Sequence, residues 1–209
     1  NGVEISFAKL LKDIDALDKF LYEIYQATPI DISLKTRIGF LNPDEYESLF
    51  KVYEKYNPSL LIVHPRTRKE LYNGTPHKDI FSEIYHHSKK RLCYNGDIFS
   101  LKDYEDIKIS FPDLNDIMIG RGAIKNPALF REIKGGKKLT TTELIDFTVL
   151  LKERYMEALK SPVFTLHKLK EIWMYSITNY PEEKKILKAI KKANKLDNFM
   201  DSILSLPEI

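Results

Sequence analysis

The chain has 209 residues, of which 43% are hydrophobic and 30% are charged. This composition supports a buried core and excludes the disordered class, which combines low hydrophobicity with high net charge. The net charge of +3 is too small to indicate a nucleic-acid partner by itself. The single cysteine, Cys93, excludes a disulfide framework and a multi-thiolate metal site. We therefore expect a cytoplasmic protein without a metal.

The sequence also bears on membranes and on the completeness of the chain. No apolar run approaches the roughly 20 residues that a membrane-spanning helix needs, so we expect no membrane partner. The chain starts at Asn1-Gly2-Val3, with neither an initiator methionine nor a signal-type apolar core. We therefore expect it to be part of something longer.

Helical and short apolar segments alternate up to about residue 130, which is typical of βα units around a parallel sheet. Apolar spacing predicts a helix over residues 9–26, and alternation predicts a strand over residues 30–38 with Lys35 and Arg37 on its polar face. Further along, the sequence predicts helices over 42–56, 79–89, 100–110 and 126–133, strands over 60–63, 91–94 and 116–119, and a polar loop over 64–76.

After Gly135-Gly136 the pattern changes to helices alone, predicted over residues 142–160, 163–179, 181–195 and 197–205. Residues 1–130 carry 18 basic and 19 acidic side chains, whereas residues 131–209 carry 15 and 11. We therefore expect an α/β domain over 1–135 and a basic, all-helical domain over 136–209. Within the helices, Phe164, Trp173 and Tyr175 are expected in the core.

Each predicted strand ends in polar or glycine-rich residues that a buried strand does not need for packing. In a parallel α/β barrel these C-terminal ends share one face, where the active site lies, so we expect the clusters to converge. The last two clusters are glycine-rich and precede helices, which is typical of a phosphate site. The clusters are Lys35-Thr36-Arg37, His64-Pro65-Arg66, Asn95-Gly96-Asp97 and Gly120-Arg121-Gly122.

Taken singly, these clusters have structural explanations. Lys35 could be a surface charge, His64 a hydrogen-bonded loop histidine, and Asn95-Gly96-Asp97 a simple turn. Four such clusters at successive strand ends favour a functional explanation.

The same residues resemble the tRNA-dihydrouridine synthase family. Ser33–Gly39 resembles its fifth-strand motif, and Leu61–Arg68 with Tyr72-Asn73-Gly74 resembles its sixth. Asn95–Ile98 resembles the seventh, and Met118–Ala123 with Asn126-Pro127 the eighth. The resemblance implies the C-terminal half of a TIM (β/α)8 barrel, strands five to eight, followed by an all-helical bundle. The helical tail resembles the family only in position, length and helicity.

This resemblance implies an FMN-dependent oxidoreductase that reduces uridine in tRNA to 5,6-dihydrouridine, with NADPH as the reductant. It places Lys35 and His64 at the flavin ring, where a cationic amine would stabilise the negative charge of reduced flavin. It places Asn95, Gly96, Asp97, Gly120 and Arg121 at the ribityl chain and phosphate of FMN.

Two features depart from the family pattern. Pro65 stands where the family usually has glycine. The family's general-acid cysteine and first four strands lie upstream of these motifs, so we expect no catalytic residue in this chain. Cys93 lies in the seventh-strand region and is expected to be a buried, inert thiol. We expect the chain to be inactive without the missing N-terminal half of the barrel.

Lysines dominate the third helix of the tail, where six of them fall within the acid-free residues 184–195. These lysines could simply form a solvated surface. The resemblance implies instead that the tail binds tRNA, and lysines contact phosphates without reading sequence. We expect RNA contacts from Arg37, Arg66, Arg68, Lys168, Lys170, Lys184, Lys188 and Lys191.

Two other functions remain open at this point. A different FMN barrel, such as a relative of dihydroorotate dehydrogenase, would act on a small molecule and would not need a basic helical tail. A non-catalytic RNA-binding fragment would keep the tail without binding flavin. Flavin absorbance and tRNA binding would discriminate among the three.

Overall fold

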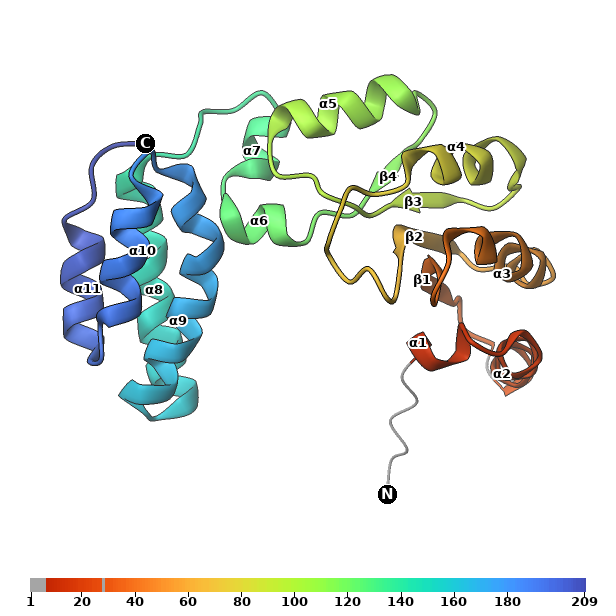
Figure 1. The fold of residues 1–209 in the computed structure, drawn as a ribbon, viewed down its shortest axis with the longest axis horizontal. Coiled ribbons are helices and arrows are strands. Elements are labelled where there is room, and N and C mark those ends of the chain that lie inside the picture. The colour runs from red at the N-terminus through yellow and green to blue at the C-terminus, as the bar shows by residue number, and fades with distance from the viewer. Residues whose placement is uncertain (1–6, 28) are drawn as a thin grey trace. The chain divides into compact units, whose positions relative to one another are not determined.

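The computed structural model describes residues 7–27 and 29–209, and it has an α/β fold with a parallel four-stranded sheet and many helices (Figure 1). The described residues divide into two compact units. Unit 1 takes in the residues up to Asp97 together with Glu105–Ile119, and unit 2 takes in Ile98–Tyr104 and Gly120–Ile209. Among the described residues, no helix is both long and apolar enough to span a membrane.

The sheet of unit 1 contains four parallel strands, and their order along the sheet is their order along the chain. Helices of this unit run along one face of the sheet (Figure 1). The parallel sheet predicted from the alternating pattern is therefore confirmed. The strands are β1 (Ser33–Gly39), β2 (Leu60–Thr67), β3 (Leu92–Tyr94) and β4 (Asp116–Ile117), and the helices beside them are α2 (Ile14–Ala27), α3 (Tyr46–Tyr53) and α4 (Lys78–His87).

Alternation along β1 decides which side chains face these helices. Leu34 and Thr36 are buried, and the Thr36 hydroxyl shares a 2.8 Å hydrogen bond with the Tyr53 hydroxyl of α3. Lys35 and Arg37 therefore belong to the opposite face of the sheet, because successive strand side chains alternate.

Strand β2 is longer than predicted. The sequence predicted a polar loop from residue 64, but β2 continues to Thr67 and pairs with β1 in the register Arg37 to His64 and Gly39 to Thr67. The hydrogen bonds of a neighbouring strand stabilise this polar segment in an extended conformation. His64 consequently lies opposite Arg37 on a strand, and the two side chains share a face.

Several other elements differ from the prediction in their bounds. The first predicted helix is two helices, α1 (Phe7–Leu10) and α2, because the Asp13 side chain accepts a hydrogen bond from the Ala16 amide 3.0 Å away and begins a new helix. The second opens with the 3-10 turn η1 (Pro43–Glu45) before α3. After β4, the structure adds α6 (Arg121–Lys125) before α7 (Leu129–Ile133). Helix α5 (Leu101–Ser110) matches its prediction, and the boundary between the units runs inside it.

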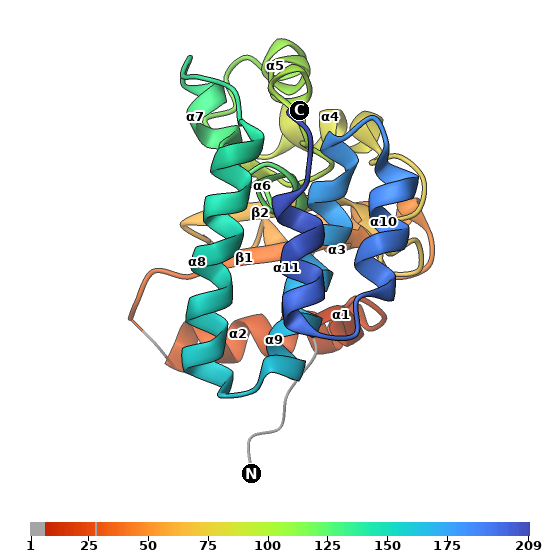
Figure 2. The same cartoon turned by 90° about the vertical axis from the view of Figure 1, so that its left-hand side faces the viewer.

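The tail of unit 2 is helical, and Figure 2 shows its four longest helices side by side. They are α8 (Thr141–Leu159), α9 (Pro162–Ser176), α10 (Glu183–Lys192) and α11 (Leu196–Leu204), with the short turn η2 (Ile177–Asn179) after α9. Trp173 is buried in their core and donates a 3.1 Å hydrogen bond to the Thr148 hydroxyl. Phe164 and Tyr175 are 62% and 38% exposed, so their predicted burial was wrong. The buried side of α9 is formed by Leu166, Leu169 and Trp173 instead.

Helix α6 is hydrogen-bonded to the tail. The Ser176 hydroxyl donates to the Ile124 carbonyl at 3.1 Å, and the Asn179 amide donates to the Lys125 carbonyl at 2.8 Å. These contacts explain why α6 and α7 group with unit 2. A domain boundary at residue 135 stays a prediction.

Candidate functional site

A buried histidine lies among cations at the ends of β1 and β2. His64 is only 5% exposed, and Arg37, Lys35 and Arg66 lie close enough to influence it. Burial, followed by the charges of Arg37 and Lys35, lowers the pKa of His64 to about 3. The imidazole is therefore neutral near pH 7, and it can make hydrogen bonds without adding a positive charge.

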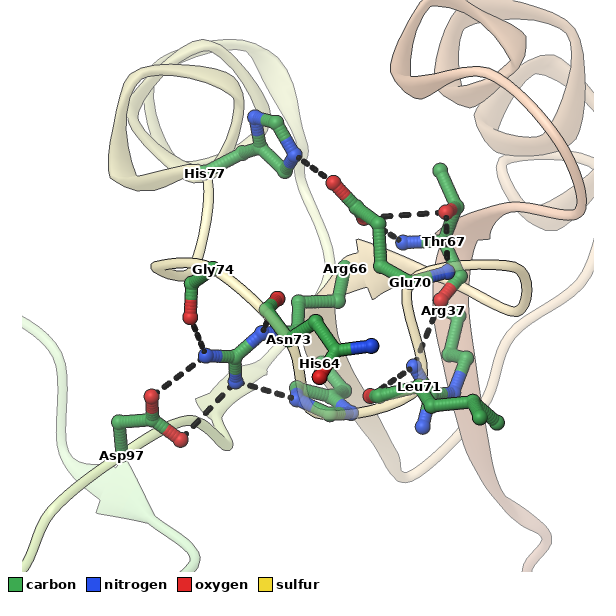
Figure 3. Close-up of polar contacts among 10 residues, drawn as sticks. All are labelled: Arg37, His64, Arg66, Thr67, Glu70, Leu71, Asn73, Gly74, His77 and Asp97. Atoms are coloured by element: carbon green, nitrogen blue, oxygen red, sulfur yellow. Dashed lines mark hydrogen bonds and ion pairs between the residues drawn. The ribbon is translucent and has the colours of Figure 1, made fainter.

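Arg66 is the polar centre of this cluster and is 0% exposed (Figure 3). Its Nη1 and Nη2 donate to the two carboxylate oxygens of Asp97 at 2.9 and 2.5 Å. Nη2 also donates to the Gly74 carbonyl at 2.5 Å, and Nε donates to the Asn73 carbonyl at 3.3 Å. The guanidinium thus joins β2 to the loop that follows it and to the turn after β3. RNA contact through Arg66 stays a prediction, because its hydrogen bonds in this structure go to protein groups.

The same guanidinium orients His64. Arg66 Nη1 lies 3.4 Å from His64 Nε2. Because a guanidinium has only donors, Nε2 must accept this hydrogen bond and the ring proton must sit on Nδ1. Arg66 thereby selects one tautomer of the imidazole.

Arg37 holds the other end of the loop after β2. Its Nη1 donates to the Thr67 carbonyl at 2.7 Å and to the Leu71 carbonyl at 2.9 Å (Figure 3). Its guanidinium carbon lies 5.7 Å from the centre of the Tyr72 ring. Burial and the nearby cations Arg68 and Arg66 lower the pKa of Arg37, and Tyr72 and Glu70 oppose that shift.

Glu70 fixes the loop from inside. Its carboxylate accepts hydrogen bonds from the Thr67 amide at 2.6 Å and the Thr67 hydroxyl at 3.0 Å, and it lies 2.7 Å from His77 Nε2 (Figure 3). Burial alone would raise the pKa of Glu70, but the hydrogen bonds from His77 and Thr67 outweigh it and lower that pKa. The sequence predicts no role for Tyr72, Glu70 or His77, because their contacts depend on how the loop closes.

Lys35 and Cys93 lie in one row across the sheet, because both pair with Ile62 in register. The Lys35 residue is exposed, yet partial loss of hydration and the charge of Arg37 lower the pKa of its ammonium, while Cys93 opposes this shift. Cys93 is 3% exposed, and burial raises the pKa of its thiol to about 11. Its predicted burial is confirmed, and a protonated buried thiol is not a nucleophile.

The turn after β3 is shaped by packing as well as by hydrogen bonds. Asn95 donates from its side-chain amide to the Met118 carbonyl at 2.9 Å. A Cβ on Gly96 would lie 3.0 Å from the Tyr94 hydroxyl, so this glycine has a packing reason. Asp97 adopts a left-handed backbone with φ of 35°, which non-glycine residues rarely do.

Gly120 and Arg121 belong to unit 2. A Cβ on Gly120 would meet no atom within 4 Å, so packing among the described residues does not require glycine there. The Arg121 guanidinium lies 5.3 Å from the centre of the Phe99 ring. Their convergence with the strand ends of unit 1 stays a prediction.

The lysines predicted to contact RNA have different environments. Lys184, Lys188 and Lys191 are exposed on α10, whose opposite side buries Ile186 and Ile190. Lys168 pairs with Glu171 at 2.9 Å. Lys170 donates to the Lys191 and Ala193 carbonyls at 3.2 and 2.5 Å, and it therefore caps the C-terminus of α10.

Arg68 lies outside the buried cluster at the strand ends. Arg68 is exposed just beyond β2, and its amide donates to the Gly39 carbonyl at 2.9 Å. Within the described ranges, no three His, Cys, Asp or Glu side chains gather as metal ligands would. The structure thus brings together Lys35, Arg37, His64, Arg66 and Asp97 in unit 1, and the α10 lysines in unit 2.

A family model described as dihydrouridine synthase matches residues 6–204. The chain belongs to the dihydrouridine synthase family. The match covers the sheet and the tail helices α8 to α11, and it ends five residues before Ile209. The sequence motifs quoted for this family, including His64 and Arg66, lie at the strand ends described above.

Three relatives of this chain carry the name tRNA-dihydrouridine(16) synthase. The protein of Pseudomonas putida is 28% identical over 183 residues, which are 84% of this chain and 56% of the relative. The protein of Aquipseudomonas alcaligenes is 24% identical over 207 residues, 95% of this chain and 65% of the relative. The protein of Neisseria meningitidis serogroup A is 31% identical over 129 residues, which are 61% of this chain and 38% of the relative. The chain thus spans less than two thirds of the length of each.

Proposed function

We propose that this chain is the flavin-binding and tRNA-binding part of a cytoplasmic, NADPH-dependent tRNA-dihydrouridine synthase. One observation carries the proposal: in a member of this family, Lys35, Arg37 and Arg66 surround a neutral His64, with Asp97 as the paired carboxylate. This positive site suits a ligand that carries or develops negative charge. Reduced flavin and RNA both meet that description.

The donor set fits FMN. When bound, FMN supplies hydride chemistry to the 5,6 double bond of uridine. Lys35 offers an ammonium of lowered pKa, and His64 offers a neutral ring, both on the sheet face away from the helices. A Cβ on Gly120 would meet no atom within 4 Å, so a phosphate has room to approach the backbone there, and Arg121 follows directly in the sequence. We assign Lys35 and His64 to the ring, and Gly120 and Arg121 to the phosphate.

We assign the residues after β3, which are Asn95, Gly96 and Asp97, to the ribityl chain of FMN. Asn95 and Asp97 also bind protein groups, Met118 and Arg66 respectively. We propose that both residues lie along the ribityl chain while they keep these contacts. Gly96 lets the backbone pass close to the ligand and also leaves space for Tyr94.

The general acid of the reaction is proposed to come from outside these 209 residues. Cys93 does not fill that role, since it is buried at 3% exposure within the sheet. The relatives named tRNA-dihydrouridine(16) synthase extend beyond the matched region. We infer that the chain contributes the C-terminal half of a TIM barrel, because a sheet with open edges needs further strands to cover them.

We propose that the tail binds tRNA through the exposed lysines of α10. Lys184, Lys188 and Lys191 lie on one helix whose other side is buried, so their ammonium groups share a surface. Such a surface contacts phosphates and positions the RNA. Arg37, Arg68 and Lys168 are proposed as further contacts, and Lys170 as a support for α10.

A combined spectroscopic and product assay tests this proposal. The purified protein should retain a flavin absorbance band after dialysis. With NADPH and a tRNA transcript, the complete protein should form dihydrouridine, which mass spectrometry of the digested nucleosides detects. Flavin binding without tRNA binding would favour a small-molecule oxidoreductase, and tRNA binding without flavin would favour a non-catalytic RNA-binding protein.

A further inference from the structure

Two polar side chains at the end of α9 bind the main chain of α6. Ser176 is 0% exposed, and its hydroxyl donates to the Ile124 carbonyl at 3.1 Å. The side-chain amide of Asn179, in η2, donates to the Lys125 carbonyl at 2.8 Å. The flavin and RNA contacts assigned above give neither residue a role. A buried hydroxyl is costly unless it is hydrogen-bonded, so the contact from Ser176 is a specific feature of the fold.

Helix α6 is too short to be stable by itself. It has five residues, whereas isolated helices shorter than about 12 residues are marginal in water. The last carbonyls of any helix also lack partners within the helix. Ser176 and Asn179 donate to two of these carbonyls, so the tail stabilises α6 in its helical conformation.

A second set of hydrogen bonds holds the residue that follows α6. The side-chain amide of Asn126 donates to Glu132 Oε1 at 2.9 Å, and its side-chain oxygen accepts from the Ala128 amide at 2.9 Å. The same Glu132 oxygen accepts from the amide of Leu139, just before α8, at 2.9 Å. Asn126 therefore connects the end of α6 to the start of the tail.

The same helix carries the residues assigned to the phosphate of FMN. Gly120 immediately precedes α6 and Arg121 is its first residue. The Gly120 carbonyl accepts a hydrogen bond from the Ala123 amide at 3.0 Å, so its backbone is part of the same turn. The carbonyls bound by the tail lie three and four residues after Arg121, which is about one helical turn. Unwinding of this turn would therefore move both phosphate-binding residues.

We propose that Ser176 and Asn179 are positioning residues for flavin binding, which hold α6 so that Gly120 and Arg121 are in place for the phosphate. This inference rests on the proposed function for the identity of the ligand. The tail, proposed to bind tRNA through α10, thereby also controls how tightly the protein retains its cofactor. Because coupling between two sites is reciprocal, bound FMN should in turn stabilise α6.

Amide hydrogen exchange of residues 121–126 in the complete protein tests the first step without a ligand. Ser176→Ala and Asn179→Ala should each speed exchange by up to about 10-fold, the effect of one lost hydrogen bond. Thr178→Ala is the matched control, because the Thr178 hydroxyl lies in the same segment but donates to the Tyr175 carbonyl at 2.8 Å. Unchanged exchange in both variants, or an equal rise in Thr178→Ala, would overturn the proposal.

Titration of flavin-free protein with FMN and with riboflavin, followed by flavin fluorescence, tests the second step. Both variants should bind FMN up to about 10-fold more weakly, because the apparent dissociation constant rises as the fraction of protein with α6 in place falls. Riboflavin lacks the phosphate, so its affinity should be the same in the wild type and the variants. An equal loss of affinity for both flavins would contradict a role at the phosphate.

The outcomes separate this inference from the proposed function. If the wild type binds FMN and the variants bind it equally well, the positioning role falls and the proposed function stands. If the wild type binds no FMN, the proposed function falls and the positioning role falls with it. Fluorescence of Trp173, the single tryptophan of the chain, reports whether the tail core stays folded in each variant. Asn179 is only partly buried, so Asn179→Ala decides the question should Ser176→Ala disrupt that core.

Discussion

Arg66 and Asp97 form a two-pronged ion pair between the end of β2 and the turn after β3, with N to O distances of 2.9 and 2.5 Å. The arginine is 0% exposed, and the aspartate side chain is 26% exposed. A buried guanidinium that loses its carboxylate keeps the cost of desolvation without the attraction that offsets it. This ion pair therefore both stabilises unit 1 and holds the end of β2 against the turn after β3 in the candidate site.

Asp97→Asn should lower the free energy of unfolding by about 3 kcal/mol, since it leaves the Arg66 charge buried beside a neutral amide. Urea denaturation followed by circular dichroism measures this loss. Asp113→Asn, at an exposed position, should change stability by less than about 0.5 kcal/mol. Equal effects of the two substitutions would show that the ion pair contributes nothing specific.

The lowered pKa of His64 predicts that the stability of the fold depends on pH between about pH 3 and pH 6.5. The pKa of His64 is about 3 in the folded protein and near its ordinary value of 6.5 when the chain is unfolded, so the unfolded state binds the extra proton in this window. Stability should therefore fall as the pH falls through the window, by up to about 1.4 kcal/mol per pH unit from this residue. His64→Gln should flatten the slope, whereas exposed His86→Gln should not. Identical slopes in wild type and His64→Gln would refute the assignment.

Arg121→Ala should weaken retention of FMN more than it weakens affinity for tRNA. A charge-assisted hydrogen bond to phosphate contributes roughly 1.5 to 3 kcal/mol, or about a 10- to 150-fold change in affinity. Flavin content after dialysis measures this change. Arg154→Ala is a suitable control, because Arg154 is exposed and pairs with Glu157. Unchanged occupancy in Arg121→Ala would mean that this loop does not bind phosphate.

Lys35→Met should slow the chemistry without unfolding the protein. The residue is exposed on the sheet, so folding does not depend on its ammonium, but reduced flavin would lose a cation that we propose stabilises its negative charge. Stopped-flow rates of flavin reduction and reoxidation are the measurement. Wild-type rates in both half-reactions would rule out a role for Lys35.

Replacing Lys184, Lys188 and Lys191 with Gln should weaken tRNA binding while NADPH still reduces the flavin. Each lost phosphate contact should reduce the slope of log affinity against log salt by roughly 0.7 to 0.9, so three contacts remove roughly 2 to 3. The modified uridine should not change, because phosphate contacts do not read bases. The control replaces the exposed Lys51, Lys78 and Lys89 with Gln. A wild-type salt slope in the α10 variant would make these lysines an ordinary solvated surface.

The sequence by itself determined the order of the four strands and of the four long tail helices. Periodicity is a local property, and so the four strands and the tail helices could be predicted from neighbouring residues alone. Burial of Cys93 followed in the same way, since a small apolar residue inside a short apolar run has no other place in a sheet. The strand-end clusters were visible because polar residues interrupt these runs.

Tertiary structure decided what those polar residues do. The extension of β2 through His64 depends on hydrogen bonds from β1, which lies about 30 residues earlier in the chain, and nothing local to residues 64–67 indicates it. Arg66 was predicted only as an RNA contact. Its acceptors come from Asn73, Gly74 and Asp97, so its burial required the loop and the next strand to be in place. Lys170 likewise became a helix cap only because the end of α10 lies against α9. A charged side chain is placed by whichever distant groups can satisfy it, and only the folded chain brings those groups together.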